Sequence, residues 1–215
     1  MVKPTSKILR SKGGFTVTEM IVVVGIVAIL SAVAIPQMVS QRRLMRTSAV
    51  MREIAAQMRY VRQQAMSQRQ AFTFQYDDVN KRIVVIDHNM SGTAVLTDAN
   101  YPNNTGSVVV RTTSLTQGGL PSSEITCAIP TGLPTTAQSA LPDGVSKTPL
   151  SSNVVNITFQ PDGTVIDANG NPVDKAIFMH NNRVANSTAS AISVLGAAGR
   201  VKIWRYDSNA NKFAE

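Results

Sequence analysis

Apolar and polar positions follow three successive patterns along this chain. From Phe15 to Ile35 nearly every residue is apolar, and Ser31 is the single polar residue after Met20. Wound as a helix at ~1.5 Å per residue, this stretch spans about 31 Å, close to the ~30 Å hydrocarbon core of a bilayer. The pattern therefore predicts a membrane-spanning helix near the N-terminus.

The second pattern covers residues 37–70, which contain no Gly or Pro and are rich in helix formers. Pro36 precedes it, and because proline cannot donate a helical hydrogen bond, we expect a kink or local melting of the helix there. Apolar side chains then recur every three or four residues, as on one face of a helix. This face consists of Val50, Met51, Ile54, Met58, Val61 and Ala65, and we expect it to pack on a globular domain.

The third pattern begins after residue 70, where charge becomes sparse and β-branched residues alternate with clusters of Gly, Pro, Asn, Ser and Thr. Strands are expected at 71–76, 82–87, 107–112, 154–160, 164–167, 175–180, 191–195 and 200–206, and loops at 89–106, 113–124 and 129–152. The first two strands form a hairpin around 77–81, and Pro161-Asp162-Gly163 makes a tight turn. The predicted fold class is α+β, with one long N-terminal helix packed on a C-terminal antiparallel β domain.

Positive charge is concentrated before the apolar run. Residues 1–14 contain four cations and no acid, namely Lys3, Lys7, Arg10 and Lys12. By the positive-inside rule, these residues keep the N-terminus cytoplasmic and direct the rest of the chain across the membrane. They also supply half of the formal net charge of +8. The rest of the chain is therefore not uniformly cationic, as a protein that binds nucleic acid over its whole surface would be.

Two interpretations of this N-terminal segment are open. An ordinary secretory signal is supported by Ala32-Val33-Ala34, which has the A-x-A form of a signal peptidase site. Glu19 counts against it, because an acid at membrane depth costs ~2.5–3.5 kcal/mol and is rarely left without a partner. Cleavage after Gly14 would create a free α-amino group on Phe15, which could pair with the Glu19 carboxylate of the same chain or of a neighbour.

The segment GGFTVTEMIVVVGIVAILSAVAIP resembles the class III signal of type IV pilins and type II secretion pseudopilins. Gly14 precedes the cut, Phe15 is the first mature residue, and Glu19 and Pro36 stand where such proteins carry an acid and a proline. The resemblance implies cleavage by a prepilin peptidase, N-methylation of Phe15, and assembly with other pilin or pseudopilin subunits into a filament. Glu19 would neutralise the N-terminus of an adjacent subunit during that assembly.

This resemblance also implies a domain organisation and a location. Residues 1–14 would be the removed leader, 15–36 the transmembrane and filament-core helix, 37–70 the amphipathic half, and 71–215 the β-rich domain. The subunit would span the bacterial inner membrane once, in contact with its lipids, with the C-terminal domain in the periplasm, and then enter a pilus or pseudopilus.

Two segments of the β domain resemble GspH/FimT-like pseudopilins and minor pilins. They are ITFQPDGTVID (157–167) and SVLGAAGRVKIWRYD (193–207). The resemblance implies a minor pilin that is built into a type IV pilus or primes its assembly. A pseudopilin of a type II secretion system is the alternative.

The strand at 200–206 is a candidate site for double-stranded DNA. Alternation places Arg200, Lys202, Trp204 and Tyr206 on one outward face, with Val201 and Ile203 in the core. Cations neutralise phosphates, and aromatic faces stack on bases. Some FimT-like minor pilins are associated with DNA binding through a C-terminal G-R-x-R motif, which Gly199, Arg200 and Lys202 match with Lys in the last place. The candidate set is Gly199, Arg200, Lys202, Trp204 and Arg205. The alternative is a charged strand that blunts a sheet edge, with Trp204 half-buried against a loop or a neighbouring subunit.

A second basic set lies on the amphipathic helix. Arg52, Arg59, Arg62 and Arg69 fall on a face next to the apolar one. Two interpretations are open: a solvated face or subunit contact, or a stripe that binds a polyanion.

Catalysis is not expected. The chain has no G-x-S-x-G, H-E-x-x-H, Walker A or G-x-G-x-x-G motif. His88 and His180 are expected to be exposed structural residues, and Cys127 a buried free thiol. No metal or cofactor is expected, and an exported β-rich enzyme with an ordinary signal anchor is kept as a further alternative.

Overall fold

The computed structural model describes residues 14–91, 106–116, 121–167 and 170–215. The chain forms two compact units, Met1–Gln41 and Arg42–Glu215. The basic residues of the expected leader, Lys3, Lys7, Arg10 and Lys12, lie outside the described residues, as does most of the loop expected at 89–106.

One long helix, α1, runs from Val17 to Gln68. Pro36 lies inside α1, and the helix continues through it, so the expected local melting does not occur. In the second unit, the apolar face predicted at three- to four-residue spacing is buried, with Ile54, Met58 and Val61 fully inaccessible. That prediction is confirmed. Arg69 follows the helix with a φ of 53° and belongs to the turn, so it is not part of the helical arginine face.

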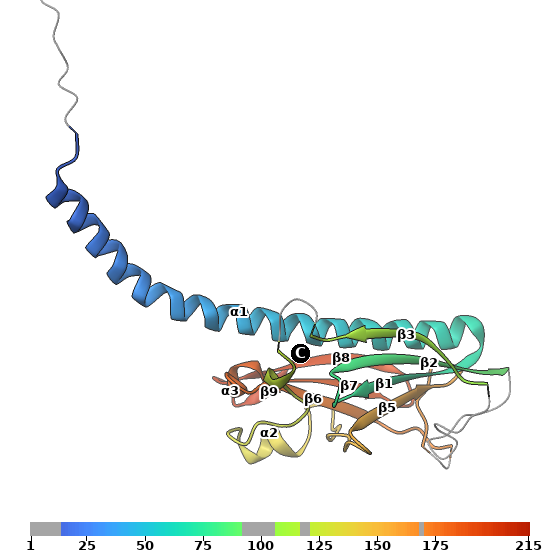
Figure 1. The fold of residues 1–215 in the computed structure, drawn as a ribbon. Helices are drawn as coiled ribbons and strands as arrows, with labels where there is room; N and C mark the ends of the chain where they lie inside the picture. The colour runs from blue at the N-terminus through green and yellow to red at the C-terminus, as the bar shows by residue number, and fades with distance from the viewer. Residues whose placement is uncertain (1–13, 92–105, 117–120, 168–169) are drawn as a thin grey trace, which may run out of the picture. The chain divides into compact units, whose positions relative to one another are not determined.

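The second unit contains two antiparallel sheets (Figure 1). The first has the order β3-β2-β1-β5, with β1 Gln70–Asp77, β2 Arg82–Ser91, β3 Val108–Ser114 and β5 Val154–Phe159. The second has the order β4-β6-β7-β8-β9, with β4 Ile125–Thr126, β6 Lys175–Asn181, β7 Ser190–Leu195, β8 Arg200–Asp207 and β9 Lys212–Ala214. Short helices are η2 Ser122–Glu124, α2 Thr135–Ser139 and α3 Ala185–Thr188. The α+β fold class, with a long helix packed on an antiparallel β domain, is confirmed.

The main core lies between α1 and the inner faces of both sheets. Phe72, Phe74 and Ile157 from the first sheet and Ile177 and Ile192 from the second pack with the apolar face of α1. Burial of these large side chains is the main force that holds the helix on the sheets.

A smaller second core covers the opposite face of the second sheet. Phe178 and Trp204 point to this side and pack with Phe213 of β9 and with Leu133 and Leu141 from the segment around α2. The Phe178 and Phe213 rings meet edge to face, with centroids 5.5 Å apart. The second sheet is therefore covered on both faces.

The prediction of a strand at 164–167 is wrong. This segment forms only isolated bridges, Phe159 with Val165 and Ile166 with Pro172. The N–H of Val165 donates to the oxygen of Gly196 at 2.8 Å, so the segment also contacts the β7–β8 turn.

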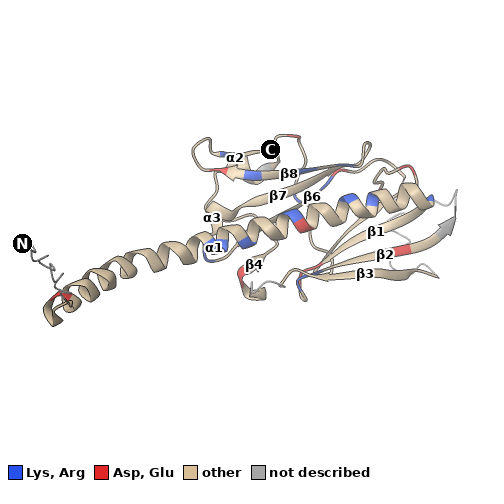
Figure 2. Ribbon diagram, turned by 90° about the horizontal axis from the view of Figure 1, so that it is seen from above, with Lys and Arg blue, Asp and Glu red and all other residues tan. Residues whose placement is uncertain are grey.

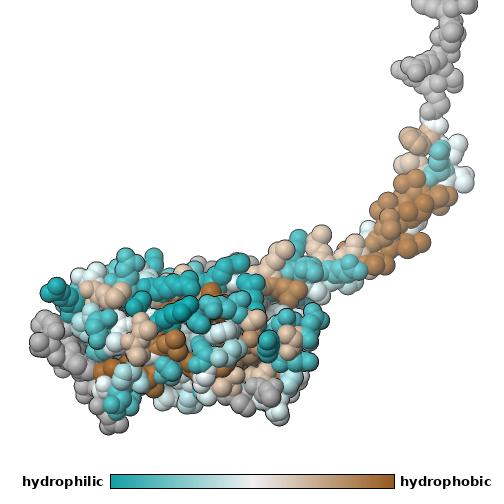
Figure 3. All heavy atoms as spheres, turned by 180° about the vertical axis from the view of Figure 1, so that it is seen from behind, coloured by the Kyte–Doolittle hydropathy of each residue, from teal (hydrophilic) through white to brown (hydrophobic). Residues whose placement is uncertain are grey.

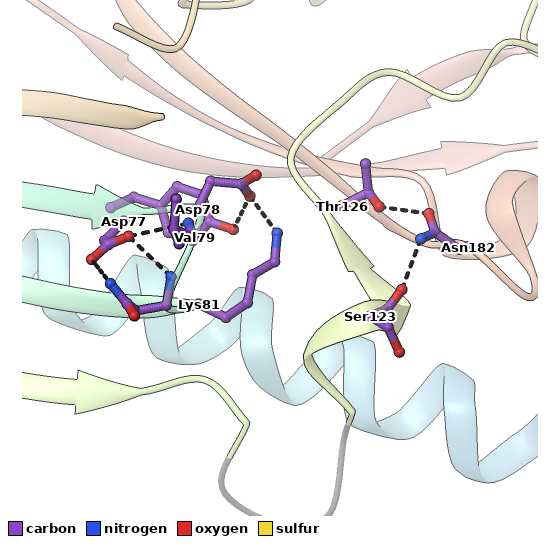
Figure 4. A network of polar contacts seen from close by, with 9 residues as sticks. Asp77, Asp78, Val79, Lys81, Ser123, Thr126 and Asn182 are labelled. Carbon is purple, nitrogen blue, oxygen red and sulfur yellow. Dashed lines mark hydrogen bonds and ion pairs between the residues drawn. The ribbon is translucent and has the colours of Figure 1, made fainter. Parts of the chain in front are cut away.

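Two polar networks fix the ends of the strands (Figure 4). In the β1–β2 turn, the Asp77 carboxylate accepts hydrogen bonds from Val79, Asn80 and Arg82. Burial acts to raise the pKa of Asp77, but these hydrogen bonds outweigh it and hold the pKa below its ordinary value. The predicted hairpin is confirmed. Elsewhere, Asn182 accepts from Thr126 at 2.6 Å and donates to the Ser123 oxygen at 2.9 Å, which attaches β4 to β6.

Candidate functional site

The N-terminal half of α1 is apolar and unburied. This stretch is long and apolar enough to cross a membrane, and no part of it is buried. Figure 3 shows these hydrophobic side chains gathered on the helix, in contrast to the largely hydrophilic surface of the second unit. A signal sequence would meet the same criterion, so this property alone does not separate an anchor from a cleaved signal.

Glu19 has a partner within its own helix turn. The N–H of Thr16 donates to Glu19 Oε2 at 3.4 Å, and the N–H of Glu19 donates to Thr16 Oγ1 at 3.2 Å. This reciprocal pair is a capping box, for which the sequence T-V-T-E was a readable indication that the sequence analysis missed. Glu19 therefore has hydrogen-bond partners within its own helix, and its pairing with a freed α-amino group on Phe15 stays a prediction.

A cavity of about 450 Å³ lies between α1 and the turn that joins β7 to β8. It is lined by Arg59, Arg62, Gln63, Met66, Gly199, Arg200 and Val201, and is called the arginine cavity below. Two basic sets that were separate in the sequence, one on the helix and one on the late strand, thus meet in one place. Figure 2 shows the Lys and Arg positions that recur along α1, between the two sheets, and those on β8.

Arg62 is fixed in this cavity by main-chain acceptors. Its Nε donates to the oxygen of Gly163 at 3.3 Å, and its Nη2 donates to the oxygen of Ala198 at 2.8 Å. Arg62 therefore joins α1 to two turns, one in segment 157–167 and one in segment 193–207. These are the two segments that resemble GspH/FimT-like proteins.

The two turns approach each other at glycine. Gly199 has a φ of 57°, and a Cβ there would lie 1.9 Å from the oxygen of Gly163, whose own φ is 83°. Only glycine, which has no side chain, fits at position 199. The tight turn expected at Pro161-Asp162-Gly163 is confirmed.

The outward face predicted for the late strand is not free. Trp204 is only 6% exposed, because the segment containing Leu133 and Leu141 covers it. Its indole N–H donates to Ser193 Oγ at 2.8 Å, and Ser193 Oγ donates to Asp143 Oδ2 at 2.6 Å. The expectation that Trp204 can stack on bases is wrong, whereas Val201 and Ile203 pack against the main core as predicted.

The cations of β8 differ in their surroundings. Lys202 Nζ lies 4.9 Å from the centre of the Trp204 ring and 3.4 Å from a carboxylate oxygen of Glu215. Arg200 lies 3.9 Å from the same carboxylate group and remains largely exposed, as does Arg205. On the helix, Arg52 and Arg59 are exposed, so of the predicted stripe only Arg59 and Arg62 reach the arginine cavity.

Both histidines are buried, and the expectation that they are exposed is wrong. His88 Nε2 lies 2.7 Å from Thr73 Oγ1, and its Nδ1 lies 3.0 Å from Ser107 Oγ. Burial lowers the pKa of His88 to about 4, although the Asp87 carboxylate acts in the opposite direction.

Cys127 is a buried free thiol, as predicted, and burial raises its pKa to about 11. In the described parts of the chain, no group of three or more His, Cys, Asp or Glu side chains could hold a metal ion.

Solved structures similar to this chain include a minor pilin in two crystal forms. No family model and no curated protein matches the sequence. The type IV minor pilin FimU of Pseudomonas aeruginosa, in space group P21, matches with a TM-score of 0.42 and 16% identity, over 78% of this chain and 92% of that chain. FimU in space group P65 matches with a TM-score of 0.41 and 16% identity, over 78% and 97% of the two chains. At these scores, neither match decides what the chain does.

Proposed function

We propose that this chain is a FimT/GspH-like minor pilin, a non-enzymatic filament subunit of a type IV pilus. The observation that carries the proposal is the N-terminal half of α1, which is apolar, unburied and charged only at Glu19 from residue 15 to residue 41. The same helix continues into the core of a β domain. A long exposed apolar surface of this kind requires lipid or other apolar helices around it.

The steps of this function follow from the N-terminal residues. A prepilin peptidase would cut between Gly14 and Phe15, and Phe15 would be N-methylated. Before that cut, the helix would hold the subunit in the inner membrane, with the basic leader on the cytoplasmic side. During assembly, helices of other subunits would replace lipid around residues 15–36, and Glu19 would pair with the α-amino group of a neighbouring Phe15.

The cleavage step is tested by expressing the full chain with and without a prepilin peptidase and sequencing the N-terminus of the product. We expect an N-methylated Phe15 only when the peptidase is present. An N-terminus at Ile35 would instead identify Ala32-Val33-Ala34 as a signal peptidase site, and the proposal would fail in favour of an exported protein.

The assembly step needs a separate variant. Glu19→Ala leaves the cleavage site intact, so we expect normal processing but loss of the subunit from sheared filaments. A processed wild-type subunit that enters the pseudopilus of a type II secretion system, and not a pilus, would favour the pseudopilin alternative.

DNA binding is a second candidate function. The observation that favours it is the arginine cavity, where Arg59, Arg62 and Arg200 converge from two distant parts of the sequence. A mobility-shift assay with double-stranded DNA and the full chain in nonionic detergent tests it. Absence of retardation at low salt would exclude this second function without affecting the proposed role in a filament.

A further inference from the structure

We infer that the free edge of β3 is a docking site for an extended strand of a partner protein. The strand that fits carries apolar side chains against the valines of β3 and an acidic side chain opposite Arg111. This inference goes beyond filament assembly and DNA binding, because neither function needs this edge. Only the choice of a partner protein over a second copy of this chain rests on the membrane-anchored role proposed above.

β3 differs from the other edge strands of the two sheets in its length and in its cover. The edge strands are β3 and β5 in the first sheet and β4 and β9 in the second. β4 has two residues and β9 has three, and β5 is bridged at both ends, where Ser151 pairs with Val154 and Val165 pairs with Phe159. β3 has seven residues, and no segment of the described chain pairs with its outer edge. A free edge of this length presents a row of main-chain donors and acceptors to which another strand can add.

The side chains on this edge are apolar as well as exposed. Val108, Val109 and Val110 are 52%, 57% and 49% exposed, and the next two residues of the strand, Arg111 and Thr112, are also exposed. Because successive side chains of a strand point to opposite faces, Val108 and Val109 give both faces of the edge an apolar surface. An added strand would cover these valines with its own side chains while its main chain pairs with β3.

Two features limit which strands can add to this edge. The register shifts between Val85 and Ile86, so Val110 is left without a partner on β2 and forms a bulge, which bends the strand. Arg111 lies over the Tyr60 ring, 5.3 Å from its centre, and makes no ion pair within the described residues. A cation directly opposite Arg111 would be repelled, whereas a carboxylate would pair with it. The edge therefore favours a strand that carries an acid at that place.

A second copy of this chain fits the edge less well than another protein does. Pairing is more stable between antiparallel strands than between parallel ones. Figures 1 and 2 show that β3 runs along the C-terminal half of α1. Antiparallel pairing of two β3 strands would therefore direct the two α1 helices oppositely, and their apolar segments would leave from opposite ends of the pair. Two anchors in one membrane do not allow this arrangement.

The test uses the full chain in nonionic detergent and a short fluorescein-labelled peptide of alternating valine and threonine with one central glutamate. Anisotropy should show saturable binding of this peptide. The same peptide with every amide N-methylated has no main-chain donors and should not bind. Hydrogen exchange should become slower in β3 when the unmodified peptide is bound, and should not change in β4 or β9.

Three substitutions locate the site and measure its charge preference. Val109→Lys removes an apolar contact and adds a cation to the edge, so it should weaken binding roughly threefold to fivefold. Arg111→Glu should weaken binding of the glutamate peptide and strengthen binding of a matched lysine peptide, each roughly threefold to fivefold. Val79→Lys is the control, because Val79 is 68% exposed in the β1–β2 turn and lies outside β3, and it should change neither value.

Each other outcome contradicts a distinct statement. If the wild-type chain does not bind the glutamate peptide, the inference fails, while the processing of Phe15 is tested separately and is unaffected. Equal binding of the N-methylated peptide would overturn strand addition, and equal weakening by Val79→Lys would overturn β3 as the site. A dimer of the full chain that Val109→Lys dissociates, measured by analytical ultracentrifugation, would make a second copy the occupant and overturn the partner protein. Circular dichroism melting curves confirm that each variant is folded.

Discussion

Arg62 of α1 donates a 2.8 Å hydrogen bond to the main-chain oxygen of Ala198, although 136 positions separate the two residues. Through Nε the same side chain also reaches the oxygen of Gly163, in the turn that follows β5. Ala198 lies in the turn between β7 and β8, so one guanidinium joins the helix to both sheets. The two carbonyl oxygens satisfy donors on Nε and Nη2, and the side chain stays partly exposed, so holding the charge here is compatible with stability.

Arg62→Ala should lower the free energy of unfolding by roughly 2–3 kcal/mol, since it removes two hydrogen bonds from a charged donor. Arg62→Lys keeps the charge but cannot direct two bonds to separate acceptors, so most of the loss should remain. Urea unfolding followed by the fluorescence of Trp204, the single tryptophan, measures both effects. Arg59→Ala serves as the control and should change stability by less than ~0.5 kcal/mol. Equal stability of the Arg62 and Arg59 variants would contradict a structural role for Arg62.

Gly199→Ala should be more damaging than an ordinary substitution at a positive φ. The added Cβ would lie 1.9 Å from the Gly163 oxygen, a main-chain atom that cannot move without shifting the turn. We expect a loss on the order of 3 kcal/mol or more, with displaced signals for the β7–β8 turn in NMR spectra.

Gly144→Ala is the matched control for this variant. Gly144 has a φ of 85° but no atom near its absent Cβ, so it isolates the backbone cost of about 1–2 kcal/mol. If the two alanine variants were equally stable, the close contact between the turns would not be the reason that position 199 holds glycine.

The features that local sequence periodicity determines were predictable. The buried face of α1, with Ile54, Met58 and Val61, follows from the helical repeat, and the β1–β2 hairpin follows from its turn residues. Even the hydrogen bonds of Glu19 had a local indication, because Thr16 lies three residues before it, as a capping box requires. Each of these depends on residues within one or two turns of each other.

The features that depend on distant segments were not predictable. Alternation along β8 correctly placed Trp204 opposite Val201, but it could not show that residues around Leu133 and Leu141 cover that face. In the same way, no spacing in the sequence indicated that Arg62 would meet a turn 136 residues later. The arginine cavity depends on that long-range contact, and for this reason the two basic sets were interpreted separately.

Ser193 links the second core to the segment that covers it. Ser193→Ala would leave the Trp204 N–H and the Asp143 carboxylate without their shared hydroxyl partner, and a buried donor without a partner costs about 1–3 kcal/mol. We expect destabilisation in that range and a shift in the Trp204 emission of the folded state, because the indole environment changes. Asp143→Asn keeps an acceptor for Ser193 and should cost less. A Ser193→Ala variant as stable as the wild type would show that the hydroxyl is dispensable.

His88 should make the stability of the β domain depend on pH between about 4 and 6.5. Its folded pKa of about 4 lies below the ordinary 6.5, so in this window the unfolded chain binds a proton that the folded chain does not. The His88 contribution is therefore complete above pH 6.5 and is lost as the pH falls toward 4, with a total of up to about 3 kcal/mol. Unfolding free energies measured by urea titration at several pH values give this slope. His88→Gln can still bond with Thr73 but cannot take up the proton, so it should flatten the slope, and a variant with an unchanged slope would assign the pH dependence to other groups.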